Sequence, residues 1–207
     1  MTTIPDSSAV AESINKIDYR NIILDKETQT IFLKETGMRI GFGAIGKGYA
    51  ADKAKARLIK AGAKAGIINA SGDLTTWGKQ PSDKPWTIGI TNPLNKYRVF
   101  SWFPVDERAV VTSGDYERFV EFNGKKYSHI IDPRSGYPAR GLVSVTVFAS
   151  KAELADALAT SICVMGAHSG INMDGQIDKV DCIIIDKNGK ILKSKNIQLD
   201  PIDDEEN

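Results

Sequence analysis

A glycine-rich stretch carries the first residues whose types and spacing indicate chemistry. The segment RIGFGAIGKGYAAD, residues 39–52, places four glycines and Lys47 at the start of a helical pattern. A glycine turn at a helix start exposes backbone N–H groups and the positive end of the helix dipole, so it can bind an anion such as phosphate. A tight strand-to-helix turn without a ligand is the simpler alternative, and the loop alone does not decide between them.

Two standard phosphate motifs fit this loop only in part. Gly41, Gly43 and Gly46 match G-x-G-x-x-G, but residues 60–66 lack the acidic residue that would hold a ribose. The loop also matches the start of G-x-x-x-x-G-K, but glycine follows Lys47 where a P-loop has Ser or Thr to bind Mg²⁺. Neither of these nucleotide-binding folds is therefore predicted.

A predicted helix over residues 151–165 carries the second candidate group. Asp156 and Thr160 are four residues apart, so they lie one helical turn apart on the same side, next to small residues. Oxygen ligands of this kind suit Mg²⁺. A solvated aspartate beside a threonine that bonds back to the helix is the alternative. We expect Asp156 to be exposed or semi-exposed, and the apolar face to consist of Leu154, Leu158, Ile162 and Met165.

His129 is the best candidate for a general base. It follows the second strand of a predicted hairpin whose turn, Asn123-Gly124, suits the two positive-φ positions of a type I′ turn. In that register Phe122 faces Lys125, Val120 faces Tyr127 and Arg118 faces His129. A structural role for this histidine is the alternative. Asp132 is predicted to form a turn before Pro133.

The elements that must position these residues are mostly short strands joined by tight turns. Helices are predicted over residues 7–16, 47–61 and 151–165, the first capped by a serine, and a short strand is predicted to end in the glycine loop. Strands outnumber helices, which favours an α+β fold with mostly antiparallel sheets over a repeating βαβ chain. We expect one domain over residues 1–199 and an acidic, disordered tail over 200–207.

The composition narrows the function classes. The chain has 207 residues and a formal net charge of +1, so it has no bulk electrostatic footprint for nucleic acid. It contains two cysteines and two histidines, too few for a Cys/His zinc site to be expected. We find no apolar run long enough to span a membrane and no signal peptide at the N-terminus, so the chain as written reads as cytoplasmic.

Five motifs in order resemble the ApbE family, the FAD:protein FMN transferases. After GAIGKGYAAD come NASGD (69–73), TSGDYER (112–118), SHIIDPRSGYP (128–138) and ADALAT (155–160), and the resemblance runs from about residue 17 to about 195. It implies an ApbE-like, T-fold-like architecture, with FAD as substrate and Mg²⁺ as cofactor. The reaction implied is transfer of FMN to a Thr or Ser hydroxyl of an acceptor flavoprotein, with release of AMP.

The resemblance also assigns roles to individual residues. The implied Mg²⁺ ligands are Asp156, Thr160 and the carbonyl of Ala44, and the implied base is His129. The implied flavin and phosphate contacts are Gly41, Lys47, Thr112, Ser113, Gly114 and His129. Asn69 and Asp73 would either contact the residues that bind the substrate or lie on the flavin side of the site. The TSG stretch is not read as a serine nucleophile, because no G-x-S-x-G elbow is present.

Two departures from the family pattern leave alternatives open. Family members usually have Asp where this chain has Gly41, so Gly41 either marks a lost flavin contact or holds a positive φ. The family's N-terminal portion, about 100 residues that include a secretion or lipoprotein signal, has no counterpart here, and family members are often periplasmic or lipid-anchored. The chain therefore reads as a flavin transferase, with a Mg²⁺-dependent FAD pyrophosphatase and a non-catalytic flavin-binding remnant as alternatives.

Overall fold

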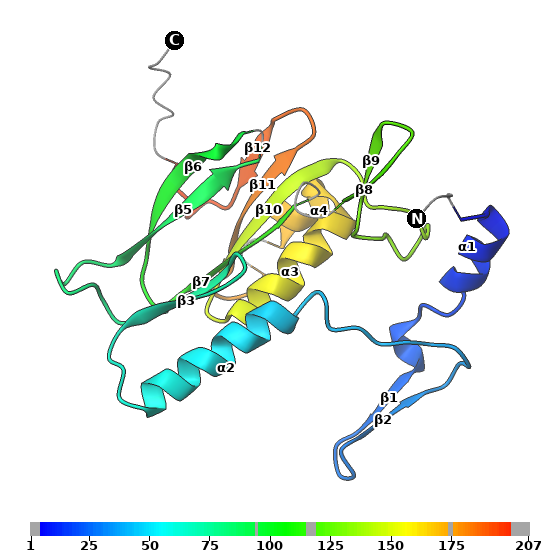
Figure 1. The fold of residues 1–207 in the computed structure, drawn as a ribbon, viewed down its shortest axis with the longest axis horizontal. Helices are drawn as coiled ribbons and strands as arrows, with labels where there is room; N and C mark the ends of the chain where they lie inside the picture. The colour runs from blue at the N-terminus through cyan, green and yellow to red at the C-terminus, as the bar shows by residue number, and fades with distance from the viewer. Residues whose placement is uncertain (1–4, 94, 115–118, 174–175, 200–207) are drawn as a thin grey trace.

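A six-stranded antiparallel sheet forms the body of the protein (Figure 1). The structure is a computed structural model and describes residues 5–93, 95–114, 119–173 and 176–199. The strand order is β12-β11-β10-β7-β4-β3, and this arrangement confirms the predicted α+β class. Its strands are β3 (Gly66–Ala70), β4 (Asp73–Trp77), β7 (Ala109–Gly114), β10 (Leu142–Ala149), β11 (Asp181–Asp186) and β12 (Ile191–Lys193).

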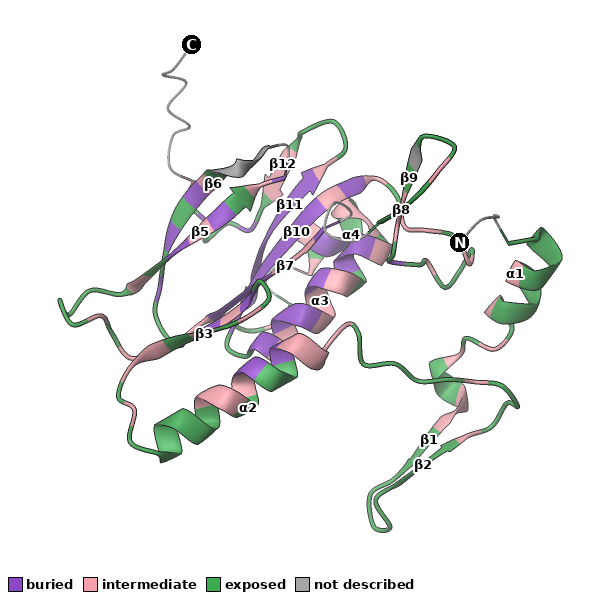
Figure 2. Ribbon diagram, in the orientation of Figure 1, coloured by how far each residue is buried: buried purple, intermediate pink, exposed green. Residues whose placement is uncertain are grey.

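Helices cover one face of this sheet and a hairpin covers the other. The helices are α2 (Gly46–Lys60), α3 (Ala152–Met165) and α4 (Ala167–Asn172), and the hairpin consists of β5 (Trp86–Asn92) and β6 (Asn95–Val105). Burial is concentrated along β10, β11 and the adjoining face of α3 (Figure 2). Successive strand residues point to opposite faces, so in β10 Val147 packs toward the helices and Phe148 toward the hairpin.

The helix-covered core depends on small residues of α3. The buried residues of this helix are Ala152, Ala155, Asp156, Ala159, Ile162 and Cys163. The predicted apolar face is confirmed at Ile162 and in part at Leu154 and Leu158, which are partly buried and pack against the core, but it is wrong at Met165, which is 39% exposed. Short side chains let the helix axis lie close to the sheet, whereas leucines at those positions would hold it away.

The α2 and α3 helices meet at a close contact. A Cβ on Gly48 would lie 2.5 Å from the carbonyl carbon of Ala152, so only glycine fits there. The carboxylate of Asp52 accepts hydrogen bonds from the backbone N–H groups of Ala152 and Glu153, each at 3.1 Å. Asp52 thereby caps the first turn of α3 from the neighbouring helix, and the two contacts fix the start of α3 against α2.

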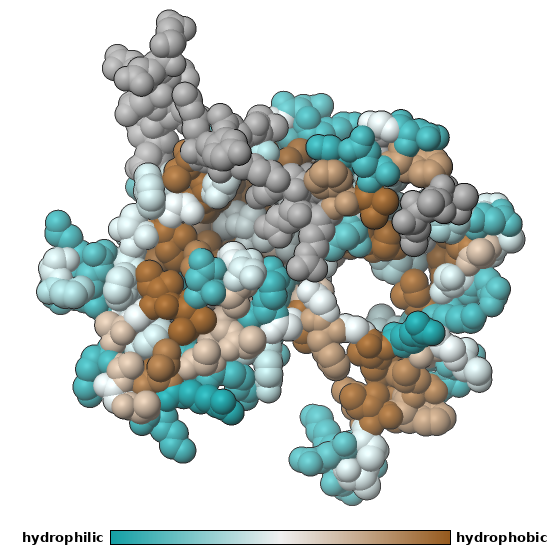
Figure 3. Space-filling view, in the orientation of Figure 1, coloured by the Kyte–Doolittle hydropathy of each residue, from teal (hydrophilic) through white to brown (hydrophobic). Residues whose placement is uncertain are grey.

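The N-terminal part of the chain forms an arm beside this body (Figure 1). It contains α1 (Ser7–Ile14), a short 3₁₀ turn at Tyr19–Asn21, and the hairpin of β1 (Ile22–Asp25) and β2 (Thr30–Leu33). The predicted first helix is confirmed, but Asp6 and not a serine is its N-cap residue. Hydrophobic side chains gather over the hairpin (Figure 3), where Ile23, Leu24, Ile31 and Phe32 are exposed.

The strand predicted to end in the glycine loop is not formed. Residues 38–42 have no strand partner, and the chain reaches α2 through a turn at residues 43–45. Glycine is unfavourable in strands, and here Gly41 and Gly43 interrupt the segment. In the described part of the chain, no helix is long and apolar enough to cross a membrane.

The predicted hairpin around Asn123-Gly124 is confirmed. It consists of β8 (Phe119–Phe122) and β9 (Lys125–Ser128), and both turn residues have positive φ. Phe122 pairs with Lys125 and Val120 with Tyr127, as expected. Arg118 and the acidic tail, residues 200–207, lie outside the described residues, so their predictions stand untested, as does the assignment of residues 1–199 to one domain.

Candidate functional site

A cavity of about 800 Å³ opens between the glycine loop, α3 and the segment that follows β9. Four residues singled out in the sequence line it: Ala44, Lys47, His129 and Thr160. They come from three separate stretches of the chain, so the fold brings the predicted groups together. The remaining lining residues are Phe42, Gly43, Gly46, Ser71, Ile130, Ile131 and Val164.

A buried cluster of charged side chains lies behind the glycine loop. The ammonium of Lys47 donates a hydrogen bond to Oδ1 of Asp73 at 2.7 Å, and the Asp73 side chain is fully buried. Asp156 is 2% exposed, so the expectation of an exposed or semi-exposed aspartate was wrong. The reason is the short-residue packing of α3, which brings this side of the helix against α2 and the sheet.

Burial is the main influence on the Asp73 carboxyl group. It raises the pKa of Asp73 to about 7, because a charged carboxylate loses hydration inside the protein. The hydrogen bond from Lys47 acts against this change and lowers the pKa, whereas the charge of the neighbouring Asp156 raises it further. The carboxyl groups of Asp73 and Asp156 therefore lie close together inside the protein. Lys47, which binds Asp73, is the cation that also lines the cavity.

The glycine loop and α3 are joined through Asp156. The Gly48 N–H donates to Oδ2 of Asp156 at 3.2 Å. In a regular helix this N–H would bond to the carbonyl four residues earlier, which here belongs to Ala44. No described backbone N–H donates to the Ala44 carbonyl, so its oxygen is available at the cavity wall.

These oxygen atoms fit a hard divalent cation. A backbone carbonyl, a carboxylate and a hydroxyl are ligands that Mg²⁺ accepts, and Ala44, Asp156 and Thr160 offer one of each. If both carboxyl groups were ionised, Lys47 would leave one negative charge unbalanced. Oδ2 of Asp73 is also buried without a hydrogen-bond partner.

The side chains of the described residues are compatible with this set of donors. Among the described residues, no group of three His, Cys, Asp or Glu side chains is placed to hold a metal. A site built on one carboxylate together with a carbonyl and a hydroxyl would not produce such a cluster. Assignment of Ala44, Asp156 and Thr160 to Mg²⁺ therefore stays a prediction, which the chemistry of the donors supports.

His129 lies at the rim of the cavity and is exposed. A narrow apolar cavity of about 260 Å³ adjoins it on the side of α1, and His129 and Ile131 line both cavities. The imidazole can therefore be reached by a group that approaches from outside the main cavity. This position suits a base that takes a proton from an incoming hydroxyl or water.

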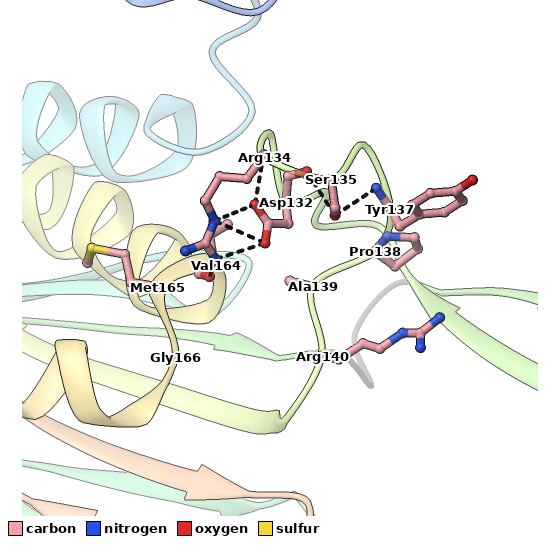
Figure 4. Close-up of a pocket in the computed structure, with 10 residues that line it drawn as sticks. All are labelled: Asp132, Arg134, Ser135, Tyr137, Pro138, Ala139, Arg140, Val164, Met165 and Gly166. Atoms are coloured by element: carbon pink, nitrogen blue, oxygen red, sulfur yellow. Dashed lines mark hydrogen bonds and ion pairs between the residues drawn. The ribbon is translucent and has the colours of Figure 1, made fainter. Parts of the chain in front are cut away.

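The loop after His129 is held by Asp132 (Figure 4). Its carboxylate accepts three hydrogen bonds from the Arg134 guanidinium, at 2.9, 3.2 and 2.8 Å, and these bonds with Arg134 hold the pKa of Asp132 below its usual range. Its carbonyl accepts from the Gly136 N–H at 2.8 Å. Arg134 also donates to the Val164 carbonyl of α3 at 2.8 Å. Asp132 is thus the turn former that the sequence favoured.

The TSG stretch is divided between two faces of the sheet. The Ser113 hydroxyl lies 3.4 Å from the Thr160 hydroxyl, on the helix-covered face. Thr112 points to the opposite face, where its hydroxyl lies 2.9 Å from that of Thr146. The end of β7, Gly114, is buried. The structure thus brings Ser113 to the site and turns the Thr112 side chain away, and the flavin contacts of all three residues stay predictions.

Gly41 is exposed, and no atom lies within 4 Å of the position that its Cβ would take. It does not have a positive φ. The alternative that Gly41 serves a left-handed conformation was therefore wrong. Its contact with a flavin nucleotide stays a prediction.

Two interactions were not anticipated from the sequence. One is the Lys47–Asp73 ion pair and the other is the capping of α3 by Asp52. Asp73 is separated from Lys47 by 26 residues, and no local spacing rule connects residues so distant. The available signal was the NASGD motif, which placed a carboxylate directly after a turn.

Comparison with known proteins identifies the family. A model of the ApbE family matches residues 1–184. The chain belongs to the ApbE family. Among curated relatives, FAD:protein FMN transferase from Klebsiella pneumoniae is 33% identical over 205 residues, 97% of this chain and 63% of that protein. The enzyme of the same name from Treponema pallidum is 32% identical over 94% of this chain and 58% of its own.

Solved structures agree with this assignment. The crystal structure of the ApbE protein from Thermotoga maritima superimposes with a TM-score of 0.87 at 32% identity, over 93% of this chain and 63% of that chain. The apo form of the flavinyl transferase ApbE from Pseudomonas stutzeri gives a TM-score of 0.77 at 26% identity, over 93% and 60%. The chain thus spans about 60% of the length of these ApbE relatives.

Proposed function

We propose that this ApbE-family chain transfers the FMN moiety of FAD to a Thr or Ser hydroxyl of an acceptor flavoprotein, in a Mg²⁺-dependent reaction that releases AMP. The observation that carries the proposal is the convergence of Lys47, Ala44, Thr160 and His129 on one cavity. The names of the relatives, FAD:protein FMN transferase, supply the reaction class.

The proposed chemistry is a phosphoryl-type transfer within the FAD pyrophosphate. The acceptor oxygen attacks the phosphorus of the FMN half, a new P–O bond forms, and the P–O bond to the AMP phosphate breaks. AMP leaves with the electron pair of that bond, and His129 takes the proton of the attacking hydroxyl. A bound Mg²⁺ would supply neutralisation of the charge on the phosphate oxygens.

The residues around the cavity divide this work. Lys47 binds the pyrophosphate through the charge and hydrogen bonds of its ammonium, at the positive end of the α2 dipole. Ala44 and Thr160, which line the cavity, and Asp156, which is buried behind the glycine loop, would hold Mg²⁺. His129 lies at the exposed rim of the cavity, and a protein acceptor can approach from this side.

Hydrolysis of FAD to FMN and AMP is the second candidate. The exposed position of His129 favours it, because water reaches the base as readily as an acceptor hydroxyl. The two reactions use the same residues and differ only in the nucleophile.

One experiment separates the candidates. The protein is incubated with FAD and Mg²⁺, with and without an acceptor domain that carries a Thr flavinylation site, and AMP is measured. AMP formed only with the acceptor supports transfer, and AMP formed equally without it supports hydrolysis. No AMP in either case rejects both reactions and leaves a non-catalytic flavin-binding protein.

A further inference from the structure

The two side chains of the Lys47–Asp73 ion pair differ in their exposure to solvent. The Lys47 side chain is 36% exposed and lines the main cavity, whereas the Asp73 side chain is fully buried and does not line it. Among the described residues, Asp73 is the partner found for the Lys47 ammonium. The lysine therefore reaches the cavity while its counter-ion stays behind the wall.

Asp73 is held in place by the sheet. It is the first residue of β4, pairs with Ala70 of β3, and follows a tight turn at Ser71 and Gly72, both with positive φ. The Asn69 side chain closes this turn by accepting the Gly72 N–H at 2.8 Å. The backbone of Asp73 therefore has little freedom to move, and this fixes the base of its side chain.

Lys47 has the opposite character. It occupies the first turn of α2, and its four-carbon stem has many rotamers, whose loss opposes a fixed position of the ammonium. The ion pair with Asp73 ties this flexible stem to the rigid sheet. An ammonium has three N–H donors, so one can stay on Asp73 while others are directed at an anion in the cavity.

A second ion pair with a buried carboxylate joins the residue before β7 to the start of β11 and serves for comparison. Arg108 and Asp181 lie 2.6 Å apart, with side chains 31% and 5% exposed. Nη2 of Arg108 also donates to the carbonyls of Phe148 and Lys179, so the bonds found for this nitrogen all go to groups of the protein. This pair lies off the main cavity. Lys47 differs because its side chain lines that cavity.

We propose that Asp73 is a positioning residue, which fixes the Lys47 ammonium at the cavity wall so that it binds the pyrophosphate of the substrate in one orientation. This inference rests on the proposed function. Asp73 itself does not touch the substrate, and its effect on binding acts through Lys47. The ligand class recognised in this way is a diphosphate diester, of which FAD is one.

A double-mutant cycle on FAD affinity tests the proposal. FAD binding is measured by titration of flavin fluorescence, without turnover, for Lys47→Ala, Asp73→Asn and the double variant. Lys47→Ala should weaken binding roughly 10- to 150-fold, the range of a charge-assisted contact. Asp73→Asn should weaken it at least several-fold, and the double variant should bind no more weakly than Lys47→Ala. Losses that multiply in the double variant would mean that Asp73 acts independently, which overturns the proposal.

Asp181→Asn is the matched control, since it removes a buried carboxylate from an ion pair of similar exposure away from the cavity. It should lower the melting temperature but leave FAD affinity unchanged. Equal losses of FAD affinity in Asp73→Asn and Asp181→Asn would reduce the role of Asp73 to general stability and overturn the proposal.

A variant that keeps both charges covers the case in which Asp73→Asn does not fold. Lys47→Arg keeps the charge and can still pair with Asp73, but its planar donors point differently. FAD affinity should fall by about tenfold, and unchanged affinity would contradict a role for orientation. Failure of the unmodified protein to bind FAD would instead reject the proposed function, so the two failures are distinguishable.

Discussion

The close contact between α2 and α3 leads to a quantitative prediction for Gly48→Ala. The added methyl carbon would lie 2.5 Å from the Ala152 carbonyl carbon and 2.7 Å from the Glu153 nitrogen. Ordinary contact begins at 3.4 Å, and the Ala152 carbonyl oxygen lies nearer still to the added carbon, so the helices must separate by more than 0.9 Å, the difference between 3.4 and 2.5 Å. Both neighbours are backbone atoms, which cannot rotate away as a side chain would.

The cost of this substitution is that of overpacking. Inserting a methyl group into a tightly packed contact costs about 1–3 kcal/mol, and alanine recovers at most about 1 kcal/mol through its higher helix propensity. For a chain of this size, each kcal/mol lowers the melting temperature by about 2–4 °C. We therefore expect a decrease of a few degrees in the melting temperature.

Gly46→Ala is the matched control for this prediction. It makes the same substitution two residues earlier in the same helix, where no atom lies within 4 Å of the added carbon. Thermal unfolding should show Gly46→Ala at or slightly above the stability of the unmodified protein. Separation of the helices should also weaken the bond from Gly48 to Asp156 and lower Mg²⁺-dependent AMP release. Equal stability of the two variants would refute the packing argument.

Three further substitutions test individual roles. Asp156→Asn keeps a hydrogen-bond acceptor for Gly48 but removes the charge, so it should abolish Mg²⁺-dependent AMP release while near-ultraviolet circular dichroism stays unchanged. His129→Ala should lower turnover by about 10²–10⁴-fold, with a much smaller change in FAD affinity and loss of the acidic limb of the pH–rate profile. Gly41→Asp should leave the melting temperature unchanged, because the site is open and lacks a positive φ, and should raise FAD affinity.

Each of these has a result that would contradict it. Full metal-dependent activity of Asp156→Asn would remove that residue from the metal site. An acidic limb that persists in His129→Ala would count against its role as the base. A fall in FAD affinity in Gly41→Asp would show that an acidic group there repels the substrate phosphates.

The fold class could be predicted because its signals are local. The type I′ turn at Asn123-Gly124 fixed the register of β8 and β9, and Gly166 ended α3 with a φ of 87°. These features depend on a few neighbouring residues, so the sequence contains them directly.

The packing of α3 could not be predicted in the same way. The helical period marked Leu154 and Leu158 as the apolar face, but tertiary packing buried the alanine side together with Asp156. Which side of a helix faces the core depends on how close its neighbours lie, and here Gly48 sets that distance. No pattern within α3 carries this information.

The candidate site was predicted in part. Motifs supplied Lys47, Ala44, Thr160 and His129, which line one cavity. The partner of Lys47 was not predicted, because Asp73 reaches it through the pairing of β3 and β4 and not through sequence spacing. The Thr112 side chain lies on the other face of its strand, a consequence of alternation that a motif match does not take into account.

The proposed reaction of this chain moves FMN from FAD onto a protein hydroxyl. The most direct test is intact-mass and peptide mass spectrometry of an acceptor domain after incubation with the protein, FAD and Mg²⁺, with a Thr→Ala acceptor as control. We expect one FMN per acceptor, attached to the Thr, with an equal amount of AMP, and none on the control. Release of AMP with an unmodified acceptor would contradict transfer.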